Sequence, residues 1–222
     1  MINNFAFIKE EKVISIELAN RILLRFDEIY EKNNYTKIAP NIIKLQESDI
    51  IKEPLLSDLL HKIKKKFELI LKTSDLIFLQ LWLVSSKSNN SNKNTLPYIP
   101  HIDRDRRQKA MVYLHDLDIE HGPIHLGKPK NTNEIEQIRK KLPKEFQKKG
   151  LNTIDKEHLE SDLIPIIGKT GDVVFFDTNT PHKAGIIKDN YHRKILRFDF
   201  QRPCHKLKTY SLENLINKLK VF

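Results

Sequence analysis

The sequence predicts an α+β fold with a mainly β core, a barrel or jelly roll with helices packed outside it. Apolar residues recur at helical spacing in the first third of the chain, whereas later apolar runs have strand length or alternate with polar residues. A chain of 222 residues, 39% of them hydrophobic, favours one domain over residues 1–222. We expect a helical part at about 15–72 and a jelly-roll core at about 76–203, with a helical insert at about 130–162.

Two helices are expected near the N-terminus, after a short strand over residues 5–14. Ser15 is a suitable N-cap for the first helix, which carries apolar residues at helical spacing up to Tyr30. Pro54 stands where a first-turn proline belongs and begins the second helix, whose apolar stripe reaches Leu71. The lysines on its polar face are most simply a solvated surface.

Short strands are expected beyond residue 76. The run LIFLQLWLV (76–84) is apolar and aromatic and predicts a buried strand with Gln80 as its one polar residue. A satisfied core amide is slightly favoured for Gln80 over a donor that lines a cavity. The polar stretch 85–94 predicts a loop at the edge of the site. Further strands are expected over 109–117, 124–127, 168–177 and 192–200, and helices over 133–150 and 211–222.

The formal net charge is +10, from 39 Lys and Arg against 29 Asp and Glu. A basic chain can bind nucleic acid, but a solvated surface is the favoured interpretation and a nucleic-acid partner is disfavoured. No apolar run approaches the roughly 20 residues that cross a bilayer, and the N-terminus lacks the features of a signal peptide. The single cysteine, Cys204, suits a reducing compartment. We therefore expect a cytoplasmic protein with a small-molecule substrate and no membrane partner.

His101, Asp103 and His182 form the most informative pattern in the chain. Residues two apart in a strand point to the same side, so His101 and Asp103 can face one metal ion. His182 follows an apolar strand (VVFF) and a Thr-Pro turn, as a distal ligand at a strand end would. Two imidazoles and a carboxylate occupy one face of an octahedron, which suits a non-haem Fe(II) centre that also binds oxygen and a co-substrate.

Arg193 follows His182 by eleven residues and begins the next predicted strand. Its guanidinium can hold the distal carboxylate of a dicarboxylic acid through a bidentate pair. Burying this charge would be costly without an anionic partner. Arg197 lies on the same face of the predicted strand and is the rival for this contact. Residue chemistry alone leaves the choice between these two arginines open.

With these residues in place, the chain resembles the phytanoyl-CoA dioxygenase-like group of Fe(II)/2-oxoglutarate oxygenases over most of its length. FAFIKEEKVISIELANRILLRFDEI is similar to the opening strand and helix of that group. HID and then MVYLHDLDIEHGPIHLG are similar to its ligand strand, turn and next strand. GDVVFFDTNTPHKAG is similar to the strand that delivers the distal histidine, and RKILRFDF to the strand that begins with the 2-oxoglutarate arginine.

The resemblance implies a double-stranded β-helix in which His101, Asp103 and His182 hold iron and Arg193 binds the 5-carboxylate of 2-oxoglutarate. It implies Fe(II), 2-oxoglutarate and O2 as cofactor and co-substrates, and hydroxylation of a substrate with release of succinate and carbon dioxide. A halogenase is disfavoured, because Asp103 fills the ligand position that chloride would need.

Two departures from the family pattern affect the site. LGKPKN stands where the family often has Pro-Gly-Ser-His, which changes the expected lid and substrate contacts. Ala184 stands where a Ser or Thr often touches 2-oxoglutarate. Thr178, Thr180 and Gln80 are the candidates to replace that contact, so Gln80 and Thr180 join Arg193 as expected cofactor-binding residues.

Three arginines directly follow the metal pair, namely Arg104, Arg106 and Arg107. Alternate ones can face the cavity mouth and bind a carboxylate or phosphate of the substrate, and a solvated basic strand edge is the simpler alternative. The remaining histidines of the core region are expected to be structural or to lie at the surface: His115, His121, His125 and His192.

The sequence therefore predicts a 2-oxoglutarate-dependent non-haem iron dioxygenase that hydroxylates a small metabolite, with an anionic metabolite as one option. A nucleic-acid demethylase of the AlkB type would suit the positive charge, but Arg193, Arg197 and Arg202 do not give its R-x5-R spacing. A non-catalytic cupin-like metal-binding module is the third interpretation. It is disfavoured because a decayed site would tend to lose one of its ligands.

Overall fold

The computed structural model describes residues 6–32, 34–88, 96–103, 106–128, 153–154 and 163–203. Its helices are α1 (Ile16–Lys32), α2 (Glu47–Ile50), α3 (Pro54–Leu71) and the 3-10 turn η2 (Ile119–His121). Its strands are β1 (Phe7–Glu10), β2 (Thr36–Ala39), β3 (Ile42–Leu45), β4 (Ile77–Lys87), β5 (His101–Ile102), β6 (Gln108–Tyr113), β7 (Ile124–Leu126), β8 (Thr153–Ile154), β9 (Ile164–Pro165), β10 (Val173–Asp177), β11 (His182–Ala184) and β12 (His192–Gln201).

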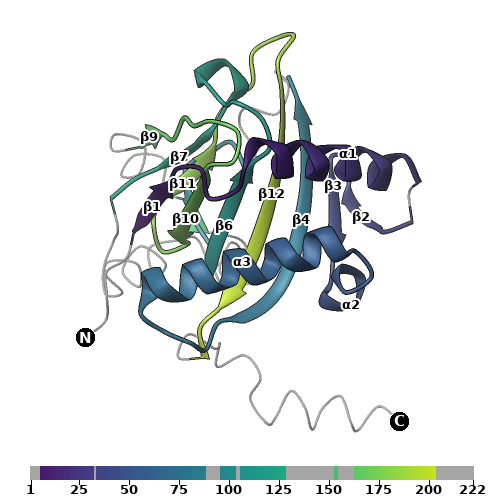
Figure 1. Cartoon of the computed structure of the whole chain (residues 1–222). Coiled ribbons are helices and arrows are strands. Elements are labelled where there is room, and N and C mark those ends of the chain that lie inside the picture. The colour runs from purple at the N-terminus through teal and green to yellow at the C-terminus, as the bar shows by residue number, and fades with distance from the viewer. Residues whose placement is uncertain are drawn as a thin grey trace, which may run out of the picture.

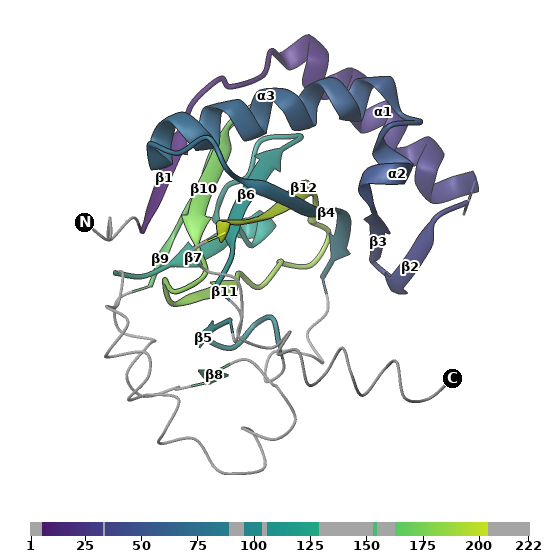
Figure 2. The ribbon, with the colours of Figure 1, turned by 90° about the horizontal axis from the view of Figure 1, so that it is seen from below.

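The strands form two antiparallel sheets that face one another. The larger sheet has the order β1-β10-β6-β12-β4-β3-β2, and the smaller one has the order β8-β5-β11-β7-β9. Helices α1 and α3 cover the outer face of the larger sheet, while the smaller sheet lies on its other side (Figures 1 and 2). This arrangement confirms the predicted mainly β fold, a double-stranded β-helix with flanking N-terminal helices.

The two long helices begin where the sequence predicts. Ser15 Oγ accepts a hydrogen bond from the Leu18 N–H at 3.1 Å, as expected for the N-cap of α1. Helix α3 starts at Pro54 and buries the predicted apolar stripe against the sheet. Phe67 of α3 lies 4.9 Å from the Phe175 ring, measured between centroids, and joins the helix layer to β10.

Strand β12 lies inside the larger sheet, and its alternate side chains face two environments. Leu196, Phe198 and Phe200 are buried in the cluster that packs against the helices. Arg193 and Arg197 face the opposite side, where they line a cavity between the sheets. The period of two along one strand therefore separates core residues from candidate site residues.

The region 15–72 is less helical than predicted. Between α1 and α2, the hairpin β2–β3 extends the larger sheet by pairing β3 with β4, with Ile43 opposite Leu83. Strand β4 also runs on to Lys87, into the stretch expected to be a loop, because β12 pairs with it as far as His192. Short strands of this kind acquire their stability from cross-strand partners, which local periodicity does not reveal.

Several expectations lie outside the described residues: the helices over 133–150 and 211–222, Arg104 and Cys204. Of the predicted insert at 130–162, the structure describes only the short strand β8, which pairs with β5. Among the helices that are described, none has the length and apolar character needed to cross a membrane.

Candidate metal centre and cavity

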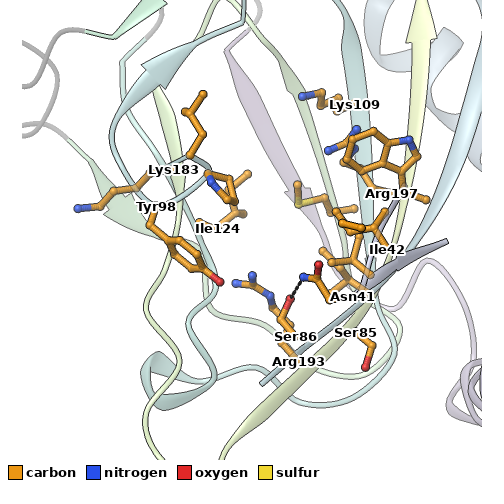
Figure 3. Close-up of a pocket in the computed structure, with 18 of the residues that line it drawn as sticks. Asn41, Ile42, Ser85, Ser86, Tyr98, Lys109, Ile124, Lys183, Arg193 and Arg197 are labelled. Carbon is orange, nitrogen blue, oxygen red and sulfur yellow. Dashed lines mark hydrogen bonds between the residues drawn. The ribbon is translucent and has the colours of Figure 1, made fainter. Parts of the chain in front are cut away.

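A cavity of about 1110 Å³ lies between the two sheets (Figure 3). Strands β4, β6 and β12 line it from the larger sheet, and β5, β7 and β11 from the smaller sheet. The turn of the β2–β3 hairpin contributes residues 39–42 to the lining. This volume slightly exceeds the range of roughly 300–1,000 Å³ that is typical of small-molecule sites.

His101, Asp103 and His182 meet at this cavity although 79 residues separate Asp103 from His182 in sequence. The pairing of β5 with β11 places His182 directly opposite His101, and Asp103 follows β5 by one residue. Asp103 Oδ1 lies 3.8 Å from His101 Nε2 and 3.5 Å from His182 Nε2. One ligand atom from each residue lies within 4.8 Å of the others, the spacing expected around a single metal ion.

Both imidazoles are held in the orientation that a metal ligand needs. His101 Nδ1 contacts the Ile99 carbonyl oxygen at 2.8 Å, and His182 Nδ1 contacts the Thr180 carbonyl oxygen at 2.9 Å. A proton on each Nδ1 satisfies these contacts and leaves the Nε2 lone pairs directed at the shared centre. Burial, together with the nearby His182, lowers the pKa of His101 to about 3, which keeps this imidazole neutral. The donor set therefore fits a divalent cation.

Lys109, which was not among the predicted site residues, holds the other oxygen of Asp103. Its Nζ lies 2.5 Å from Asp103 Oδ2, so the carboxylate presents Oδ1 to the imidazoles and Oδ2 to the ammonium. Burial raises the pKa of Asp103, but the charge of Lys109 and the hydrogen bond with His182 outweigh burial and leave it well below the usual value. The alternation of Lys109, Met111 and Tyr113 along β6 is the signal that could have placed Lys109 in the cavity.

Arg193 is a buried cation that no described carboxylate neutralises. It is 6% exposed, its Nε has no hydrogen-bond partner in the described part of the chain, and burial lowers its pKa. Tyr98 and Arg193 point toward one another in Figure 3. A buried guanidinium without a counter-ion is unfavourable, so this position is suited to an anionic ligand.

Arg197, the rival of Arg193, already has a carboxylate partner. Its Nε and Nη2 donate to the two oxygens of Asp199 at 2.8 and 2.9 Å, and Asp199 is fully buried. Gln80 donates to Asp199 Oδ2 at 2.7 Å. Of the two arginines, Arg193 is therefore the better candidate for an exogenous dicarboxylate.

Gln80 and Thr180, both expected to contact the co-substrate, are hydrogen-bonded to other parts of the protein. Gln80 is a core amide bonded to Asp199, and the Thr180 hydroxyl donates to the Ala6 carbonyl oxygen at 3.2 Å. Neither residue lines the cavity. Thr178 Oγ1 accepts from the Arg107 N–H at 2.8 Å. The hydroxyls of Thr178 and Thr180 therefore form hydrogen bonds with the backbone of neighbouring segments and do not line the cavity.

The arginines after the metal pair differ in position. Arg106 Nε contacts both oxygens of Asp177, at 2.9 and 3.1 Å, and lies outside the cavity lining. Arg107 lines the cavity, with Nη1 3.6 Å from Asp199 Oδ2. The substrate-binding role expected for Arg106 is not supported, because its head group is committed to Asp177.

The other histidines form no second ligand set in the described chain. His115 lies against His121 and His192, with ring centroids 5.3 and 5.2 Å away. His125 Nδ1 contacts the Pro123 carbonyl oxygen at 3.1 Å. His192 is exposed, whereas His115, His121 and His125 are partly buried, within the structural or surface positions expected for them.

Acid is expected to destabilise the fold partly through His115. Its Nε2 accepts from the Lys194 N–H at 3.1 Å, and burial lowers its pKa from 6.5 to about 4. Because the unfolded chain binds this proton more readily than the folded chain, the free energy of unfolding falls as the pH drops from about 6.5 to about 4. Urea denaturation of His115→Gln should show a smaller fall over this window. The surface variant His61→Gln is the control, and an unchanged pH profile in His115→Gln would contradict this assignment.

Comparison with solved structures finds the same fold in proteins of low sequence identity. The epimerase SnoN, crystallised with Fe3+, alpha-ketoglutarate and nogalamycin RO, is 14% identical with a TM-score of 0.62, over 90% of this chain and 80% of that chain. EvdO2 from Micromonospora carbonacea var. aurantiaca, complexed with 2-oxoglutarate, is 15% identical with a TM-score of 0.60, over 90% and 87%. HygX from Streptomyces hygroscopicus, with iron bound, is 11% identical with a TM-score of 0.59, over 90% and 84%.

At these identities the likeness establishes the shared fold. No protein-family model matches the sequence, and no curated protein matches it significantly.

Proposed function

We propose that this protein is an Fe(II)/2-oxoglutarate-dependent oxygenase. The observation that carries the proposal is that His101, Asp103 and His182 converge in the same cavity as Arg193, a buried arginine with no described carboxylate partner. The three donors suit a non-haem iron ion, and the arginine suits a dicarboxylate. The solved structures that share the fold include ones crystallised with iron or 2-oxoglutarate.

Each residue has a distinct role in this proposal. His101 and His182 would bind the metal through Nε2, and Asp103 through Oδ1. Lys109 would keep Asp103 oriented by holding Oδ2, and Arg193 would bind the distal carboxylate of 2-oxoglutarate. When bound, iron, 2-oxoglutarate and O2 would together supply the oxidant that attacks a substrate C–H bond, with succinate and carbon dioxide as by-products of the oxidation of 2-oxoglutarate by O2.

The cavity walls would position the metal ligands and the substrate. The carbonyl oxygens of Ile99 and Thr180 hold the imidazoles from outside the cavity, so binding requires no reorientation of either ring. Apolar side chains from both sheets, Met111, Ile124 and Ile195 among them, line the space beside the metal ligands. Such walls would pack against the apolar part of a substrate and limit the orientations in which it binds.

We further propose hydroxylation of a small molecule as the outcome, as the resemblance to the phytanoyl-CoA dioxygenase-like group implies. The fold also serves an epimerase and a carbocyclase. Mass spectrometry of the oxidised substrate is therefore the measurement that distinguishes these outcomes: a product heavier by one oxygen atom supports hydroxylation.

The proposal is tested first on the wild-type chain. Anaerobic calorimetry is expected to show Fe(II) binding, and 2-oxoglutarate binding that is tighter with the metal present. Admission of air should then release succinate above the level of a protein-free iron control. An iron-loaded protein that does not bind 2-oxoglutarate would contradict the proposal. Binding of both without succinate release would favour the non-catalytic metal-binding module.

A further inference from the structure

We propose that Arg107 and Arg197 form a second anion site, which binds a carboxylate or phosphate group of the substrate. The inference rests on the proposed function, in which Arg193 takes the 2-oxoglutarate. Figure 3 shows Lys109 and Arg197 near one another and well apart from Arg193. The cavity therefore has two separate cationic ends, and one dicarboxylate accounts for only one of them.

Arg197 is held rigidly with part of its head group left for a ligand. Its Nε and Nη2 contact Asp199, and no described residue is hydrogen-bonded to Nη1. The guanidinium carbon lies 3.5 Å from the centroid of the Trp82 ring, so the ring supports the flat face of the cation. A guanidinium fixed on two sides loses little conformational entropy when it binds a further anion.

Arg107 contributes the second charge. Its backbone is anchored by two hydrogen bonds to Thr178, from the Arg107 N–H to Oγ1 at 2.8 Å and from the Thr178 N–H to the Arg107 carbonyl oxygen at 2.9 Å. Its side chain is 31% exposed and approaches Asp199 only to 3.6 Å. Asp199 thus has a bidentate pair with Arg197 and a longer contact with Arg107, and both arginines line the cavity.

Among the described residues, the charges that face the cavity do not balance. Its described lining has one carboxylate, Asp103, and six cationic side chains: Lys87, Arg107, Lys109, Lys183, Arg193 and Arg197. Adding Asp199, which lies behind Arg197, still leaves a surplus of positive charge. A bound divalent metal and 2-oxoglutarate would cancel one another and leave that surplus unchanged. A cavity with this surplus attracts an anionic substrate and repels a cationic one.

The position of the second site suits a substrate group beside the metal ligands. Lys109 contacts Asp103, and the cross-strand partner of Lys109 on β12 is Asp199. Lys109 therefore lies between the three candidate metal ligands and the Arg197–Asp199 ion pair. Trp82, Val84 and Met111 line the same region. The substrate class that fits is an organic anion whose apolar body extends from its charged group toward the metal centre.

Trp82 is the single tryptophan of the chain, so its fluorescence reports on this site directly. We would titrate hexanoate, hexyl phosphate and uncharged hexanol into the anaerobic protein loaded with Fe(II) and saturated with 2-oxoglutarate. Hexanoate or hexyl phosphate should change the Trp82 emission and bind at least about 10-fold more tightly than hexanol, because each gains a charge-assisted hydrogen bond. The two anions distinguish a carboxylate site from a phosphate site.

Two variants test the assignment of residues. Arg107→Gln should weaken binding of the preferred anion by about 10-fold and leave hexanol unaffected. Arg197→Gln by itself would leave Asp199 buried without its partner, so the double variant Arg197→Gln/Asp199→Asn removes both charges together. It should also lose the preference for anions. Lys62→Gln, which removes an exposed cation outside the cavity lining, is the matched control and should bind like the wild type.

The outcomes separate this inference from the proposed function. If the wild type binds 2-oxoglutarate and releases succinate but binds the anions no better than hexanol, the second site is refuted while the oxygenase assignment stands. If Arg107→Gln weakens the binding of 2-oxoglutarate as much as the binding of hexanoate, the two arginines belong to the co-substrate site. The inference is then also refuted. Anion binding that depends on Arg107 in a protein that binds no 2-oxoglutarate would contradict only the proposed function.

Discussion

The Asp103→Asn variant is expected to bind Fe(II) at least about 100-fold more weakly than the wild type, measured by anaerobic calorimetry. The substitution removes the single anionic donor of the three-residue set. It also leaves the Lys109 ammonium, now 2.5 Å from Oδ2, without a counter-charge beside the metal. A divalent cation would then be bound by two neutral imidazoles and would be repelled by the Lys109 ammonium beside them.

The control for this measurement is Asp116→Asn. Asp116 is an exposed carboxylate that contacts Lys169 and Thr170 and lies outside the cavity lining. Its substitution should leave iron binding unchanged. Thermal unfolding of the metal-free variants establishes that both are folded. Unaltered iron affinity in a folded Asp103→Asn protein would remove Asp103 from the ligand set.

The Arg193→Met variant is expected to lose 2-oxoglutarate affinity by about 100-fold or more while keeping its iron affinity. The physical reason is the loss of a buried charge-assisted pair with the co-substrate. The same variant should be at least as stable as the wild type without ligands, because it removes a buried guanidinium that no described carboxylate neutralises. Calorimetry gives the first quantity and urea denaturation the second.

Arg197 supplies the contrast. Arg197→Met should destabilise the fold by about 3 kcal/mol, because it leaves the Asp199 carboxylate buried without its bidentate partner. The charge-neutral Arg197→Gln/Asp199→Asn variant should retain 2-oxoglutarate binding. If instead this double variant loses 2-oxoglutarate and Arg193→Met retains it, the roles of the two arginines are reversed.

The local pattern of apolar residues was sufficient to predict the two long helices and several strands. Helix α1, helix α3 and the central strands are recognisable because their apolar residues repeat with the period of the element. The β2–β3 hairpin was not predicted, since its strands have four residues each and its pairing partner, β4, lies about 40 residues further along the chain. Pairing at that separation depends on cross-strand contacts that a local window does not contain.

The candidate site likewise contains residues that local sequence predicted and residues that it did not. His101, Asp103 and His182 were recognisable because ligand chemistry restricts the residue types and strand context restricts the spacing, and the structure brings all three together. Lys109 was missed because a lysine in a strand usually lies at the surface, and only the register of β6 turns it toward Asp103. Gln80 was expected both as a core amide, which was slightly favoured, and as a co-substrate contact, and its partner Asp199 was not foreseen.

The sequence by itself determined the periodicity of the elements, the identity and order of the candidate metal ligands, and a choice between two arginines. The tertiary structure decided which arginine has a carboxylate partner and which oxygen of Asp103 faces the imidazoles. It also decided that Arg106 turns away to Asp177 while Arg107 lines the cavity. The reason is physical: residue chemistry and spacing are local properties, whereas the pairing and burial of a charge depend on strand register and on neighbours distant in the chain.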